Sequence, residues 1–435
     1  MTAAATTETA PVEHFHSLYE HRSFALARDE MRAAALERLR QTGFPLRHNE
    51  SWAHTPLRDL LRVPYRLPTE QTQDQQPHWL PWQRGESGAA RVLLAVDGRA
   101  GDGTEAADHG PATAGSWRAG PGPAADAFDN LRIVFADTPR QIVVPGDSAS
   151  APVRYHIAHL ISDGVVAAPR TRIVLEAGAR ATIVESFESA AGRGGTPGGE
   201  PSLCLPHTKV VVGEGAQLEL VRLQAEAQSA FHVSAATIEQ AADSRVDVVS
   251  IDLGAALARG SLTALIGGSG ASCHLSGVSV AGDAQLMDAQ TVLEHAAPES
   301  QSRQLYKRVL TGASNAVFAG RIVVREAAQQ TDAFQLNSNL LLGSGSAVSK
   351  PQLEIAADDV RCSHGATVGQ LDDDQLFYLR ARGIPPGTAR VMLANGFCAE
   401  PVAGLADPEL RAAAGALIAA ELSERLAAAE TRVDG

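Results

Sequence analysis

The middle of the chain, from about residue 130 to residue 362, carries many short runs in which apolar and polar residues alternate. Examples are RIVF, RQIVV, TRIVLEAGARATIVESF, HTKVVVGEGAQLELVRL, RVDVVSIDL and GRIVVRE. Alternation with a period of two is typical of β-strands that bury one face. The pattern therefore predicts a core of β-strands.

Two of these runs resemble each other. IVLEAGARATIV begins at Ile173 and VVVGEGAQLELV begins at Val210, so Gly178 and Gly215 occupy equivalent turns 37 residues apart. Short strands joined by glycine turns are compatible with a sandwich, a barrel or a β-solenoid. The irregular spacing of the turns and the absence of long helical patterns in this part of the chain favour the solenoid.

Helical patterns mark both ends of the chain. Ser23–Gly43 combines an apolar stripe with a glycine suited to a C-terminal cap, and Thr55–Leu61 is typical of a short helix with a threonine cap and proline at its first position. Near the other end, Asp372 is predicted to cap a helix that stops at Gly383, with Gln375 completing a capping box. A last helix is predicted from Asp407–Pro408 to about Glu430.

Three regions follow from these patterns. Residues 1–129 form an N-terminal helical region, and the Gly/Ala/Pro-rich stretch at 98–125 within it is expected to be a flexible insertion. Residues 130–370 form the β core, and residues 371–435 form a C-terminal helical domain.

Composition and charge narrow the classes of function. The chain is 44% apolar and 20% charged, which is typical of globular proteins. Its net charge is −13 and it has three lysines, so a nucleic acid is not expected as a partner. Neither a secretory signal nor an apolar stretch long enough to cross a membrane is visible, and the four cysteines form no CxxC pair. We therefore expect a reduced, cytoplasmic protein without a membrane anchor.

Several common catalytic motifs are missing from the sequence. It contains no GxxxxGK[ST] loop, no GxGxxG at a strand-to-helix junction, no GxSxG elbow and no HExxH helix. The chain is therefore not expected to be an enzyme, and in particular not to hydrolyse nucleotides by itself.

The candidate metal-ligating residues are Cys362 and His364, in the stretch VRCSH. If this stretch is extended, residues two apart point to the same side, so the thiolate and the imidazole could reach one metal, as in zinc or iron–sulfur sites. Spacing alone favours a plainer alternative, a buried cysteine beside a hydrogen-bonded histidine. The other close pairs are weaker: a turn explains Cys204 and His207, and Cys273 and His274 are adjacent and face opposite sides.

The segment LFYLRAR allows two interpretations. Phe377, Tyr378 and Leu379 are core residues by default, but Arg380 and Arg382 beside these aromatic side chains could instead form a face that docks a partner.

Residues 351–384, PQLEIAADDVRCSHGATVGQLDDDQLFYLRARGI, resemble the SufB/SufD family of iron–sulfur cluster assembly proteins. The resemblance is strong over about 305–384, looser over the β core from about residue 130, and includes NESWAHTPL at 49–57. The B branch of the family reads HEAT where this chain reads CSHGAT, and it carries a cysteine in the segment that matches residues 331–343, where this chain has none. The chain therefore resembles the D branch.

The resemblance implies a right-handed parallel β-helix between helical domains, and a non-catalytic subunit of a complex with a SufB-type subunit and two copies of the ABC-type ATPase SufC. It places His364 at the interface with SufB, where a transient iron–sulfur cluster forms with shared ligands, and Cys362 beside it. It places Phe377–Arg382 in the region that docks the ATPase.

The resemblance also implies that the isolated chain holds no cofactor, and it leaves a homodimer of the isolated chain open. Two alternatives remain at this point. One is a pure scaffold that ligates nothing, and the other is a β-helix carbohydrate-active enzyme, which would need paired carboxylates on a groove.

Overall fold

The computed structural model describes residues 5–21, 30–69, 76–79, 81–82, 90–100, 126–136, 139–146, 151–196 and 198–433. The N-terminal elements are α1 (Ala5–Glu20), α2 (Glu30–Thr42), the 3₁₀ turns η1 (Glu50–Trp52) and η2 (Leu60–Arg62), β1 (Arg91–Val96), β2 (Arg99–Ala100) and α3 (Ala127–Phe135).

The core strands are β3 (Arg140–Val144), β4 (Val153–Ile161), β5 (Val166–Ala167), β6 (Arg170–Leu175), β7 (Arg180–Ser189), β8 (Leu203–Cys204), β9 (His207–Val212), β10 (Gln217–Ala225), β11 (Phe231–Gln240), β12 (Arg245–Asp252), β13 (Leu257–Ile266), β14 (Ser272–Ala281), β15 (Leu286–His295), β16 (Gln301–Leu310), β17 (Asn315–Val324), β18 (Asp332–Leu341), β19 (Ser346–Ile355) and β20 (Arg361–Gly369). The C-terminal helices are α4 (Asp373–Ala381), α5 (Pro386–Ala403) and α6 (Pro408–Val433).

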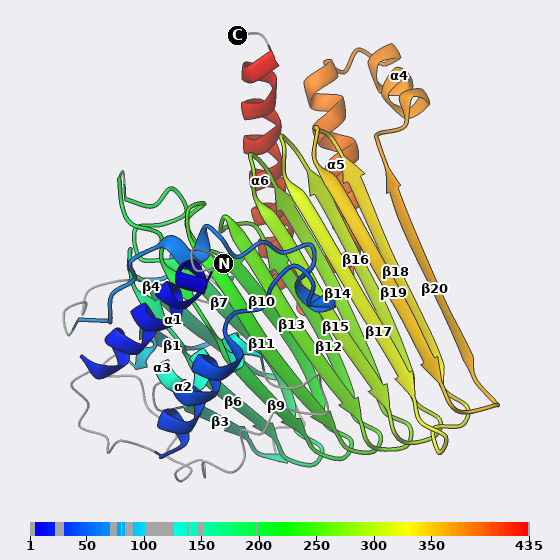
Figure 1. Ribbon diagram of the computed structural model, residues 1–435. Helices are drawn as coiled ribbons and strands as arrows, with labels where there is room; N and C mark the ends of the chain where they lie inside the picture. The colour runs from blue at the N-terminus through cyan, green and yellow to red at the C-terminus, as the bar shows by residue number, and fades with distance from the viewer. Residues whose placement is uncertain are drawn as a thin grey trace.

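The core is a parallel β-solenoid of about eight turns, which confirms the predicted β-helix with helical ends. One sheet, the β20 sheet, has the order β2-β1-β4-β7-β10-β12-β14-β16-β18-β20. The other, the β19 sheet, has the order β19-β17-β15-β13-β11-β9-β6-β3. From β9 to β20 successive strands alternate between the sheets, so each turn of the chain adds one strand to each (Figure 1). The short strands β5 and β8 lie outside these two orders, and β8 pairs with both β5 and β11.

The repeat noticed in the sequence is one turn of this solenoid. Ile173 pairs with Val210 and Arg180 with Gln217, each pair 37 residues apart. The repeat is long because the Gly-rich segment 190–201 lies within that turn, between β7 and β8. A later turn without such a segment, from Ser272 to Gln301, takes 29 residues. The segment therefore explains the irregular spacing.

The three largest apolar clusters among the described residues hold the architecture together. The largest fills the solenoid interior along its length, from Leu93 to Ala357. A second packs α1, α2 and α3 on the outer face of the β19 sheet, and a third packs α5 and α6 on the outer face of the β20 sheet. In Figure 1 the blue N-terminal helices lie at one end of the solenoid, and α4 and α5 lie near the other.

Two local predictions were wrong. RIVF at 132–135, expected to be a strand, is the end of helix α3, because Asp126 caps that helix and Asp129 returns the hydrogen bond in a capping box. The helix expected at 55–61 is only the turn η2, because the Thr55 hydroxyl donates a hydrogen bond to the buried carboxylate of Asp288 (2.5 Å) instead of capping a helix.

The helices at the C-terminal end differ from the prediction in two respects. Asp372 accepts hydrogen bonds from the N–H groups of Asp374 (2.8 Å) and Gln375 (3.1 Å), so its predicted role as a cap is confirmed, but the Gln375 side chain does not return a hydrogen bond to complete the predicted capping box. Gly383 ends this helix at a φ of +83°, as expected. The prolines that follow also begin a further helix, α5, that the sequence did not predict: Pro386 sits in its first turn, where no N–H is needed.

Two further predictions can be placed. The predicted helix at 23–43 includes α2, and Gly43 caps it at a φ of +64°. The insertion expected at 98–125 lies outside the described residues from residue 101 onward.

Candidate functional site

Cys362 and His364 lie on β20, the outermost strand of its sheet. β20 pairs in parallel with β18, with Cys362 opposite Ala333 and His364 opposite Gln335. β19 is likewise the last strand of the other sheet. Both predicted ligands therefore lie on the last strand that the chain adds to the solenoid.

The two side chains share the inner face of β20 but differ in environment. Their partners on β18, Ala333 and Gln335, are buried in the solenoid interior, so Cys362 and His364 continue two interior rows at its open end. Cys362 is half-buried against the interior apolar cluster, and His364 is exposed. Burial raises the pKa of the Cys362 thiol, and a hydrogen bond with the backbone of Ala333 opposes this effect.

This pair therefore offers one thiol and one imidazole at an open edge. The structure brings these two predicted residues onto the same side of one strand. Two protein ligands do not complete a stable metal site, which normally has three or four. Any metal or cluster bound there needs ligands from another molecule.

The open end of the solenoid exposes apolar side chains and unpaired backbone. Phe334 on β18, Ile355 on β19 and Val368 on β20 are 37%, 44% and 51% exposed. An uncovered edge strand presents unpaired N–H and C=O groups and invites pairing with another chain. This end is thus a surface suited to contact with a partner.

The predicted docking residues lie on α4, directly after β20, and α4 has no buried residue. Phe377 is 72% exposed and Tyr378 is 58% exposed, so they are not core residues. Arg382 donates a hydrogen bond to the Tyr378 hydroxyl (3.2 Å) and its guanidinium lies over that ring. Leu379 is half-buried and Arg380 is exposed.

The structure brings together one group of potential metal ligands that the sequence did not predict. Cys204, Glu226 and His232 lie together in the solenoid interior, with one ligand atom from each all within 4.8 Å of one another. The sequence compared Cys204 with the nearby His207, whereas the structure pairs Cys204 with His232, 28 residues later. That separation is one turn of the solenoid, so the signal becomes visible only when the chain is aligned by its turns.

Ionisable side chains also line the interior beside this group. Glu185 contacts Arg222 (3.3 Å) and accepts a hydrogen bond from the Thr208 hydroxyl (2.7 Å). Burial would raise the pKa of Glu185, but His159 and Arg222 outweigh it and lower that pKa to about 2. Burial first, and then Glu226, raise the pKa of the Cys204 thiol. The interior is therefore not a purely apolar core.

In the part of the chain that the structure describes, no helix combines the length and the hydrophobicity needed to span a bilayer.

Comparison with known proteins identifies the family. Residues 159–397 match the family model described as SUF system FeS cluster assembly, SufBD core domain. The iron–sulfur cluster assembly protein SufD of Escherichia coli is 30% identical over 410 residues, which cover 92% of this chain and 94% of that protein. An iron–sulfur cluster assembly SufBD family protein of Synechocystis is 33% identical over 279 residues, which cover 63% of this chain and 62% of that protein.

A SufBD family protein of Mycobacterium tuberculosis is 31% identical over 306 residues, which cover 68% of this chain and 72% of that protein. The match to the core model spans more than half of the chain, and the match to the Escherichia coli protein spans nearly all of both sequences. The chain therefore belongs to the SufBD family of iron–sulfur cluster assembly proteins and is a SufD-like member of the SUF system.

Proposed function

We propose that this chain is the SufD-type subunit of an assembly scaffold, and that it pairs with a SufB-type subunit through the open end of its solenoid. In this proposal His364, with Cys362 beside it, supplies part of the ligand set for a transient iron–sulfur cluster at that interface. The chain itself catalyses no reaction. A SufC-type ATPase docks on the C-terminal helices, with Phe377 and Tyr378 in the contact.

The observation that carries the proposal is the position of Cys362 and His364 on the last, uncovered strand of the solenoid. An interior position would leave the pair without access to a second subunit. At the open end, a partner strand can extend the sheets and bring the missing ligands to the same place.

The exposed aromatic residues of α4 support the second contact. Large exposed aromatic side chains beside arginine are typical of the centres of protein interfaces. α4 follows β20 after a short connection, so the ATPase and the SufB-type subunit would bind neighbouring parts of the chain.

The test is the iron and labile sulfide content of the complex, purified anaerobically after co-expression with SufB-type and SufC-type subunits. The complex with His364→Ala should assemble like wild type, as shown by size-exclusion chromatography, and should hold much less iron and sulfide. His274→Ala is the matched control, because His274 is a half-buried histidine in mid-solenoid whose Nδ1 lies in hydrogen-bonding contact with Asp247 (2.9 Å).

Unchanged cluster content in an intact His364→Ala complex would show that the chain acts as a scaffold without ligating the cluster. A second variant tests docking of the ATPase. Phe377→Ala with Tyr378→Ala should weaken SufC binding and leave SufB binding intact. Met31→Ala, which removes an exposed apolar side chain from α2, should change neither. Equal SufC binding by all three proteins would contradict the docking assignment.

A further inference from the structure

We propose that Cys204, Glu226 and His232 form a binding site for one thiophilic divalent metal ion, with Zn²⁺ as the best match to its ligands. This site lies inside the solenoid, away from the open end, and does not depend on a partner subunit. The proposed metal site is therefore independent of the function proposed above, and each can be tested without the other.

The solenoid register builds the site. Cys204 ends β8, His232 is the second residue of β11, and the two are direct partners in parallel pairing. Paired residues of neighbouring parallel strands point to the same side and lie about 4.8 Å apart. Glu226 follows the last residue of β10, at the turn where the chain crosses toward β11. Three ligands from three segments thus converge on one corner.

The site is closed to solvent and its polar atoms are incompletely bonded. Cys204 and Glu226 are 0% exposed and His232 is 4% exposed. Glu226 Oε2 accepts a hydrogen bond from Gln224 (2.9 Å) and lies 2.7 Å from His232 Nδ1. Neither this nitrogen nor Glu226 Oε1 has a partner in hydrogen-bonding geometry. Buried polar atoms are nearly always satisfied in native proteins, so such a group calls for a missing partner. A cation between the three side chains would satisfy these atoms.

The donor set selects the type of metal. Thiolate and imidazole ligands favour Zn²⁺ and similar transition metals, whereas Mg²⁺ and Ca²⁺ require oxygen ligands. A thiolate and a carboxylate together neutralise the charge of a divalent ion, which lowers the cost of placing it in a protein interior.

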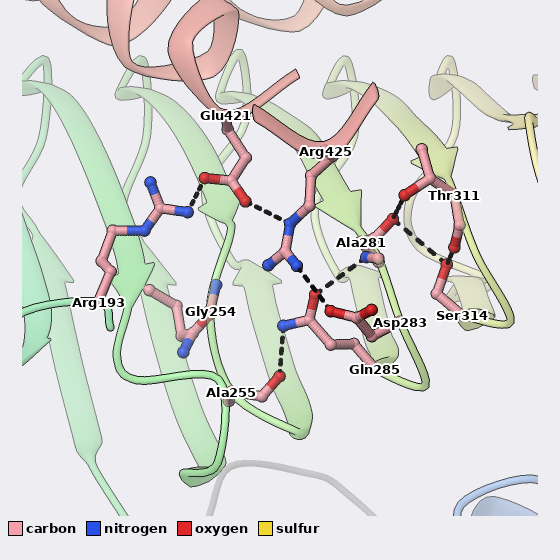
Figure 2. Close-up of polar contacts among 12 residues, drawn as sticks. Arg193, Gly254, Ala255, Ala281, Asp283, Gln285, Thr311, Ser314, Glu421 and Arg425 are labelled. Carbon is pink, nitrogen blue, oxygen red and sulfur yellow. Dashed lines mark hydrogen bonds and ion pairs between the residues drawn. The ribbon is translucent and has the colours of Figure 1, made fainter. Parts of the chain in front are cut away.

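The segment that follows β7, described up to residue 196, covers this corner. The Ala227 N–H, next to Glu226, donates a hydrogen bond to Ser189 Oγ (2.8 Å) at the start of this segment. A Cβ atom on Gly195 would lie 3.2 Å from Ala227, so the segment packs directly on the turn. Arg193 of the same segment forms an ion pair with Glu421 of α6 (Figure 2).

Cobalt is the probe for this site, because a cysteine thiolate bound to Co²⁺ gives a charge-transfer band that weak surface binding does not. The full chain is reduced, stripped with a chelator and titrated anaerobically with Co²⁺, and then with Zn²⁺. We expect one Co²⁺ per chain with a thiolate band, displaced by one equivalent of Zn²⁺. Cys204→Ser and His232→Gln should each weaken Co²⁺ binding by more than about tenfold, since even changes outside the direct ligands cost metal sites ~10–100-fold.

Cysteine controls make the result specific. Cys273→Ser removes an equally buried cysteine of the solenoid interior and should leave the band unchanged. If Cys204→Ser does not fold, the triple variant Cys273→Ser, Cys362→Ser, Cys398→Ser keeps Cys204 as the only cysteine and must keep the band. The proposal is overturned if wild type shows no thiolate band, if Co²⁺ binds without one, or if the band follows any cysteine other than Cys204.

Discussion

Glu421 holds the last helix on the solenoid, and its replacement by glutamine tests how much that contact contributes. Its carboxylate is 0% exposed and lies between Arg193 of the segment 190–201 and Arg425, one turn later on α6 (Figure 2). Arg425 donates to it at 2.7 Å and also approaches Asp283 at 3.4 Å, in a turn of the solenoid. Glu421→Gln keeps the shape of the side chain and removes its charge.

The magnitude follows from how buried each partner is. Removing one partner of a buried ion pair typically costs about 3–5 kcal/mol, because the other charge stays uncompensated. Arg193 keeps 30% of its side-chain surface exposed and Arg425 keeps Asp283 as a partner, so both losses are partly offset. We therefore expect Glu421→Gln to lower the local stability of α6 by about 2 kcal/mol.

Hydrogen exchange of the α6 amides measures this loss directly, because it reports local opening of a helix rather than unfolding of the whole chain. A loss of about 2 kcal/mol corresponds to roughly 30-fold faster exchange. Glu424→Gln is the matched control for an exposed charge on the same helix. Glu424 acts on Arg193 only across solvent-screened distance, so its loss should change stability by less than about 0.5 kcal/mol. Equal exchange rates in the two variants would show that the buried carboxylate does not hold the helix.

Two further predictions concern the solenoid interior. Burial lowers the pKa of His295, which is 0% exposed, to about 4, so the unfolded chain binds a proton below pH 6.5 that the folded chain excludes. The free energy of unfolding of wild type should therefore fall by about 2 kcal/mol between pH 7 and pH 5 because of this histidine, and His295→Gln should lack that decrease. Urea unfolding at both pH values measures the difference between the two proteins, and a difference that stays the same at pH 7 and pH 5 would contradict the prediction. Gly277→Ala should destabilise the chain by about 1–3 kcal/mol, because its Cβ would lie 2.4 Å from the Tyr306 ring. Gly260→Ala should not destabilise the chain, because its Cβ would lie 3.5 Å from the nearest atom. Equal urea midpoints for Gly277→Ala and Gly260→Ala would refute the steric argument.

The sequence predicted the solenoid because in strands such as β6 and β17 buried and partly exposed residues alternate, and this alternation is visible in the amino-acid pattern. The sequence prediction was wrong where one local pattern is compatible with more than one type of structure. The apolar run at 132–135 suits a strand or a short buried helix equally well, and the Asp126 capping box decided for the helix. Pro385 and Pro386 follow the end of helix α4 and begin helix α5. From the sequence these prolines predict only that a helix ends, and the helix that they begin was therefore not predicted.

The two candidate metal sites differ in how far the sequence could predict them. Cys362 and His364 are two residues apart on one strand, so sequence spacing alone placed them on one side of the chain. Their contribution to a cluster stays a prediction. Cys204 and His232 meet only because β8 and β11 pair in register, and Glu226 joins them from a turn. That grouping depends on the length of the solenoid turn, which a search for short motifs does not use.

The two groups of ligands also differ in what they need, and this gives one experiment that separates the proposals. The group at Cys204 has three ligands from one chain and is closed to solvent, so it should bind Co²⁺ in the isolated protein. The pair at Cys362 has two ligands at an open edge, so it should add a second thiolate signal only when a SufB-type subunit is present. Cys362→Ser should therefore leave the titration of the isolated chain unchanged and remove only the increment gained with the partner. If Cys362→Ser abolishes the thiolate signal of the isolated chain, the open edge binds the metal by itself. The signal would then require neither ligands from a partner nor the buried site at Cys204.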